Sequence, residues 1–90
     1  MFKIIYTNSY TRRAKNFIKH HPDITKQYEK TLKLLEINPF HPSLRLHKLK
    51  GRLSELYSVS INISYRISLD FLIKKNKIIL IDIGSHNEIY

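Results

Sequence analysis

The chain has 90 residues with no Cys, and 16 Lys and Arg against 7 Asp and Glu give it a net charge of +9. This length predicts one compact domain over residues 1–90, and the absence of Cys excludes disulfides, thiolate metal sites and a Cys nucleophile. No segment approaches the ~20 apolar residues that cross a bilayer, and the N-terminal apolar run is too short for a signal peptide. We therefore expect a cytoplasmic protein with no membrane partner.

The positive charge is unevenly distributed. No acidic residue precedes Asp23, and none lies between Ile37 and Ser54. Within that second stretch, four cations fall in eight positions: Arg45, Lys48, Lys50 and Arg52. A fold gains nothing from such self-repulsion, so the excess indicates a polyanionic partner. Nucleic acid is the first candidate; an acidic protein partner and a merely solubilising surface remain as alternatives.

The first half of the chain predicts a strand and two helices. Residues 2–6 favour a strand, and the next three, Thr7 to Ser9, can cap a helix that runs to about His21. Pro22 ends that helix, and Asp23 is placed to start a second helix that reaches about Ile37. Each helix has an apolar stripe at helical spacing: Tyr10, Ala14, Phe17 and Ile18 in the first, and Ile24, Tyr28, Thr31, Leu32 and Leu35 in the second. A tight corner between two helices makes an antiparallel hairpin.

The second half predicts three antiparallel strands. Every odd position from Tyr57 to Ile73 is apolar, which is strand periodicity, and a turn near residues 62–64 divides this run into two strands. Residues 74–76 make the next turn, and the apolar run in 77–83 indicates a central or doubly covered last strand. We expect an α+β sandwich: an N-terminal strand, an antiparallel helical hairpin, then a three-stranded antiparallel meander, with the helices on the odd-residue face.

This parity places Arg66 on the even face, away from the helices, among small hydroxyl side chains. An exposed Arg there can donate a planar pair of hydrogen bonds to a phosphate. A surface ion pair with Asp70 or Glu55 is the simpler interpretation. The chain also places an imidazole (His86) and a phenol (Tyr90) beyond Gly84, where they can move protons, or where the tail can simply cover the sheet edge.

The segment from Asn38 to Gly51, with its His-Lys-Leu-Lys-Gly stretch, the Tyr-Arg-Ile strand at 65–67 and the Gly-x-His-x-x-x-Tyr ending at 84–90 together resemble a known family. They are similar to the RelE/ParE superfamily of type II toxin-antitoxin toxins, and most like its RelE/YafQ ribosome-dependent mRNA interferases. The resemblance spans essentially the whole chain. It implies the RelE-like β-α-α-β-β-β fold, cleavage of mRNA on the ribosome and inhibition by a cognate antitoxin, without a small-molecule cofactor.

The resemblance also implies roles for individual residues. Arg66 matches an Arg that binds the scissile phosphate, His47 a proton acceptor, His86 an active-site His and Tyr90 a terminal aromatic near the substrate. The cations of the 45–52 segment match a basic stretch that contacts the RNA backbone. Relatives usually have Asp where this chain has Asn87, which removes a carboxylate beside the imidazole.

These residues suit metal-free ribonucleolysis, in which the 2′-OH attacks the adjacent phosphate and leaves a 2′,3′-cyclic phosphate. Such a reaction needs a base, a cation at the phosphoryl oxygens and an acid for the departing 5′-oxygen. Our hypothesis gives these tasks to His47, Arg66 and His86, with the two histidines interchangeable and Tyr90 stacking on or orienting a base. No His and carboxylate spacing suggests a metal. His20, His21 and His41 fit structural roles better.

Two functions from other classes stay open. A ParE-like toxin would inhibit DNA gyrase by binding, and a catalytically inert module on the same scaffold would only bind RNA or a protein. Two imidazoles beside an Arg favour the nuclease, because a pure binder does not need them.

Overall fold

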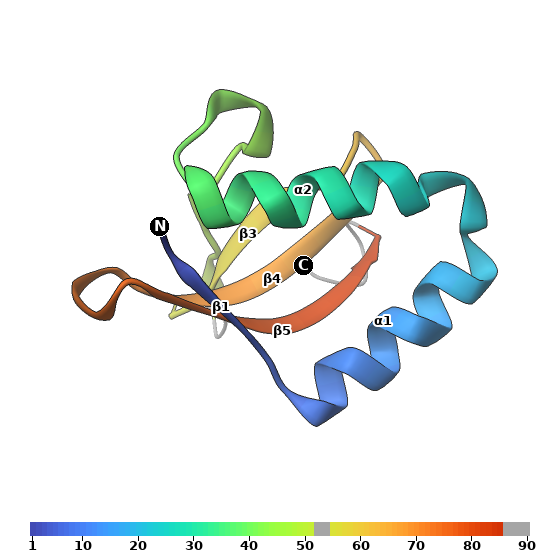
Figure 1. Ribbon diagram of the computed structural model, residues 1–90, viewed down its shortest axis with the longest axis horizontal. Helices are drawn as coiled ribbons and strands as arrows, with labels where there is room; N and C mark the ends of the chain where they lie inside the picture. Colours follow the sequence, from blue (N-terminus) through green and yellow to red (C-terminus); the bar gives the residue numbers. More distant parts are fainter. Residues whose placement is uncertain (52–54, 86–90) are drawn as a thin grey trace.

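A computed structural model describes residues 1–51 and 55–85. One five-stranded sheet carries two helices (Figure 1). In chain order the helices, 3-10 turns (η) and strands are β1 (Lys3–Tyr6), α1 (Asn8–His20), η1 (Pro22–Ile24), α2 (Thr25–Ile37), η2 (Pro42–Leu44), β2 (His47–Lys48), β3 (Tyr57–Ser60), β4 (Tyr65–Leu72), η4 (Ile73–Lys75) and β5 (Lys77–Ser85). The predicted α+β class and order of elements are confirmed.

The strands lie in the order β1-β5-β4-β3-β2. The pairs β5–β4, β4–β3 and β3–β2 are antiparallel, as the meander predicted, whereas β1 runs parallel to β5. The last strand is therefore central, which explains its continuous apolar run. A register shift between Ser68 and Leu69 interrupts the β4–β5 ladder and changes which β5 side chains face the helices beyond it.

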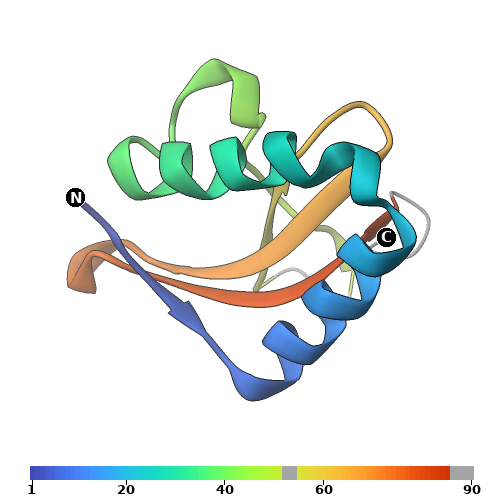
Figure 2. The same cartoon turned by 45° about the vertical axis from the view of Figure 1, so that its right-hand side comes forward.

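Local sequence explains how the helices begin and end. Thr7 caps α1, because its hydroxyl accepts a hydrogen bond from the Tyr10 amide at 3.1 Å. At η1 the chain turns a corner, and α2 then runs back across β3 and β4 (Figures 1 and 2). Asp23 does not start α2 as expected: it lies within η1, which buries Ile24, and α2 begins at Thr25 without a side-chain cap.

The hydrophobic core lies between the helices and the odd-residue face of the sheet. Both helices, η1 and η2 contribute to one cluster with β3, β4 and β5: Tyr10, Ala14, Phe17, Ile24, Leu35, Leu44, Val59, Ile67, Leu69, Phe71, Ile78, Leu80 and Ile83. The predicted helix-facing parity holds in β3 and β4, whereas in β5 the even-numbered Ile78 and Leu80 face the core beyond the register shift. It fails for Ile63 and Ile73, which are 85% and 53% exposed because they lie in the turn after β3 and in η4.

Candidate active site

The sheet brings Arg66 and His47 onto one face. His47 in β2 pairs with Ser58 in β3, and Ser58 pairs with Ser68 in β4. Arg66 lies two residues before Ser68 and pairs with Ser60. Directly paired residues share a face, as do residues two apart in a strand, so the two cationic or ionisable side chains leave the same side of the sheet. This is the side opposite the core.

His47 is exposed, and its tautomer follows from its hydrogen bond. The ring nitrogen Nδ1 lies 2.8 Å from the carbonyl oxygen of Arg45. A carbonyl oxygen only accepts, so Nδ1 donates, and the neutral ring carries its lone pair on Nε2.

Arg66 is half-buried and is held at one end of its guanidinium. Its Nη1 donates to the hydroxyl oxygen of Ser60 at 2.6 Å and to the carbonyl oxygen of Asn62 at 2.9 Å. Within the described ranges, Arg66 forms no ion pair with Asp70 or Glu55, so the simpler interpretation from sequence is not what these residues show. Sequence reasoning had missed both Ser60 and Asn62 as partners of this Arg.

The serine face is less open than expected. Ser58, Ser60 and Ser68 are each less than a tenth exposed. Arg66 lies against Ser60, because its Nη1 donates to the serine hydroxyl. The prediction of an open sheet surface around Arg66 is therefore wrong. The guanidinium is half-buried beside serine side chains that are themselves buried.

The described cations of the 45–52 segment do not all lie on the same side of the sheet. Arg45, Lys48 and Lys50 are all exposed, and Arg45 adopts a left-handed backbone conformation with φ 50° that turns the chain into β2. Lys48 pairs with Tyr57, a residue packed against the core, so it leaves β2 on the side opposite His47. Arg52 lies outside the described residues.

The other two predicted site residues, His86 and Tyr90, also lie outside the described residues, as does Asn87. The site that the structure does show consists of His47, Arg66 and the serine surface between them.

The remaining histidines form hydrogen bonds with backbone groups. His20 and His21 hydrogen-bond through Nδ1 to the carbonyl oxygens of Asn16 and Phe17 near the end of α1, at 2.8 and 2.9 Å. His41 accepts a hydrogen bond from the Ser43 amide at 3.1 Å and so caps η2. These contacts agree with the structural roles that their positions predicted.

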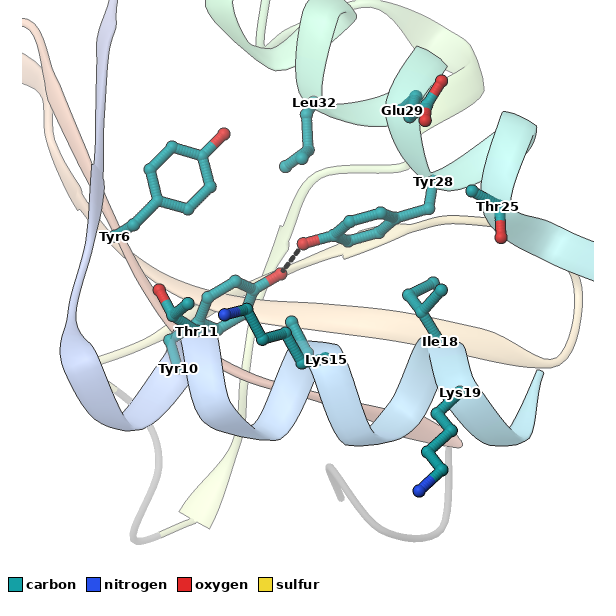
Figure 3. Close-up of a pocket in the computed structure, with 11 residues that line it drawn as sticks. Tyr6, Tyr10, Thr11, Lys15, Ile18, Lys19, Thr25, Tyr28, Glu29 and Leu32 are labelled. Carbon is teal, nitrogen blue, oxygen red and sulfur yellow. Dashed lines mark hydrogen bonds between the residues drawn. The ribbon is translucent and has the colours of Figure 1, made fainter. Parts of the chain in front are cut away.

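A separate hollow of about 550 Å³ lies between α1 and α2 (Figure 3). Inside it the hydroxyl groups of Tyr10 and Tyr28 are 2.8 Å apart and share a hydrogen bond. Burial raises the pKa of Tyr10 far above its ordinary value, and the Tyr28 hydroxyl adds to this. The walls are mostly apolar, with charged groups among the lining residues: Tyr6, Tyr10, Thr11, Ala14, Lys15, Ile18, Lys19, Thr25, Tyr28, Glu29 and Leu32. This hollow belongs to the helix layer and not to the Arg66 surface.

Among the described residues, no group of three or more His, Asp or Glu could hold a metal ion. None of the described helices has the length and apolar character needed to cross a membrane.

Comparison with solved structures shows that the chain has the fold of the RelE/ParE-superfamily toxins. It is similar to YafQ from E. coli strain BL21(DE3), with a TM-score of 0.79 at 15% identity over 100% of this chain and 99% of that one. The E. coli DinJ-YafQ complex gives 0.77 at 15%, over 100% and 99%. A metal-bound toxin from Helicobacter pylori gives 0.77 at 23%, over the whole of both chains. No protein-family model and no curated protein matches the sequence. Identities this low establish the fold alone.

Proposed function

We propose that the chain is the toxin of a type II toxin-antitoxin module and acts as a ribosome-dependent mRNA endonuclease that inhibits translation. The observation that carries this proposal is the placement of His47 and Arg66 on one sheet face, with a fixed imidazole tautomer and a fixed guanidinium. A gyrase inhibitor or an inert binding module requires neither feature.

The proposed reaction uses only side chains of this chain. Nε2 of His47 takes the proton of the 2′-OH, the 2′-oxygen bonds to phosphorus, and the bond to the 5′-oxygen breaks. Arg66 stabilises the charge on the phosphoryl oxygens, and His86 returns a proton to the 5′-oxygen. Tyr90 stacks on or orients a base, and Arg45, Lys50 and Arg52 contact the RNA backbone. Lys48 leaves β2 on the side opposite His47, so its backbone contact is to RNA away from the scissile phosphate. The two histidines can exchange roles.

A cognate antitoxin is the proposed protein partner. E. coli YafQ has been solved in complex with DinJ. In this chain the hollow between α1 and α2 combines apolar walls, including Ile18 and Leu32, with the cations Lys15 and Lys19 (Figure 3). This composition suits an apolar segment of the antitoxin flanked by acidic residues. The ribosome and mRNA are the other partners, which makes the cytoplasm the proposed location.

The test is induced expression in a bacterial host of the wild type beside Arg66→Ala and His86→Ala. Growth and mRNA 5′ ends are followed in the same cultures. We expect the wild type to stop growth and to create new in-frame mRNA ends, and both variants to lose these effects at unchanged protein level. Lys33→Ala is the matched control, because it removes an exposed cation from α2 and should leave toxicity intact.

Other outcomes point to other functions. Toxicity that persists in both variants without new mRNA ends would contradict the nuclease, and an early stop of DNA replication would favour a ParE-like gyrase inhibitor. Expression without any effect would favour the inert module.

A further inference from the structure

The guanidinium of Arg66 uses one nitrogen for the protein and leaves one edge for a ligand. Nη1 has two N–H groups, and both are accounted for by Ser60 and Asn62. Among the described residues, Nε and Nη2 have no hydrogen-bond partner. Nε is buried, so Nη2 is the nitrogen of this remaining edge that can donate to an oxygen of a phosphate.

The acceptors of Nη1 are fixed by the hairpin. Ser60 lies directly opposite Arg66 in the β3–β4 register, and its hydroxyl donates to the Asn62 carbonyl oxygen at 2.7 Å. The Asn62 side chain in turn accepts from the amides of Ser64 and Tyr65, both at 2.9 Å. Nη1, the Ser60 hydroxyl and the Asn62 carbonyl oxygen therefore form a closed triangle of hydrogen bonds beside the turn.

Two polar atoms on this face of the sheet are buried without a hydrogen-bond partner among the described residues. They are Nε of Arg66 and the hydroxyl oxygen of Ser58. Buried polar groups are normally paired, because leaving one unpaired is costly. Ser58 lies two residues before Ser60 and on the same face of the sheet.

We propose that Ser60 is a positioning residue: with the Asn62 carbonyl it holds Nη1, so that Nη2 of Arg66 meets the scissile phosphate. This role rests on the proposed function. It acts through Arg66, since the Ser60 hydroxyl is already engaged on both sides and contacts no substrate.

The first test needs no activity. In the ¹⁵N-labelled full-length chain, a held guanidinium rotates slowly and gives resolved Nη signals, whereas a released one gives averaged signals. We expect Ser60→Ala to average the Arg66 signals and Ser60→Thr, which keeps the hydroxyl, to retain them. Ser58→Ala is the matched control, because it removes a buried hydroxyl from the same strand and face without touching Arg66. Resolved signals in folded Ser60→Ala would overturn the proposal.

The second test measures coupling to the reaction. Ser60→Ala should lower the cleavage rate of the wild type by roughly tenfold, the effect of losing one hydrogen bond to a charged group. In an Arg66→Lys background the same change should have little effect, because the planar fork is gone. Equal losses in both backgrounds would show that Ser60 does not act through Arg66. If the wild type cleaves no RNA, the proposed function fails, and the NMR result still decides whether Ser60 holds the guanidinium.

Discussion

Tyr10 is buried completely, and its hydroxyl faces that of Tyr28 inside the helix layer. Burial is also the main reason why the pKa values of Tyr28 and Tyr6 are raised. A raised pKa means that the folded state holds the proton more tightly than the unfolded state does. The resulting stability is complete below pH of about 10 and is lost as the pH rises toward the folded-state pKa.

We therefore expect the free energy of unfolding to fall above pH of about 10, by up to roughly 1.4 kcal/mol per pH unit from Tyr10 alone. Tyr10→Phe should cost about 1 kcal/mol at neutral pH and should make the alkaline decline less steep. Urea titrations at several pH values measure both effects. Between pH of about 7 and 9 the free energies of unfolding of the wild type and of Tyr10→Phe should change equally with pH, which is the internal control. Equal slopes above this range would contradict the assignment of the alkaline decline to Tyr10.

The partners of Arg66 were within reach of the sequence. The predicted turn at residues 62–64 is centred on Ile63. A hairpin with this centre places Ser60 opposite Arg66, which is the observed register. What could not be predicted is which acceptor the long Arg side chain chooses, since several rotamers reach different neighbours. Nor does strand periodicity reveal that the short serines of this face would be buried.

At the scale of elements, Thr7 shows how one side chain sets the start of α1. Thr7→Ala should lower the free energy of unfolding by about 1 kcal/mol, because the Tyr10 amide loses its acceptor. The midpoint of urea unfolding measures this at an unchanged m value. Thr7→Ser keeps the oxygen and should retain most of the stability. A loss as large as that of Ala would show that the methyl group matters and the cap does not.

Long periodic segments were predictable and short ones were not. The alternation in 57–72 predicted β3, the turn and β4 because it extends over many residues. The two-residue strand β2 is too short to show a periodic pattern. It forms because His47 and Lys48 pair with the edge of β3. The parallel pairing of β1 with β5 joins the two ends of the fold, so no local pattern could indicate it.

At the scale of the whole molecule, the net charge of +9 should make the proposed RNA binding depend on salt. For single-stranded RNA, each neutralised phosphate contributes roughly 0.7 to the slope of log K against log salt. Lys50→Ala should lower this slope by about that amount if Lys50 contacts a phosphate. Fluorescence anisotropy with an uncleavable RNA between about 50 and 200 mM salt measures it. Lys33→Ala, in the helix layer, should change the slope less; equal changes would contradict a local contact.

The central position of β5 in the sheet also sets how late the sheet can be completed during synthesis. Its partners are β1, at the beginning of the chain, and β4, and the β1 contact pairs Lys3 with Lys77. A contact so distant in sequence closes a long loop and forms late. While the chain is being synthesised, β1 and β4 have no strand between them until the residues after Lys77 have emerged. We therefore expect the sheet to be completed only after the residues of β5 have been synthesised.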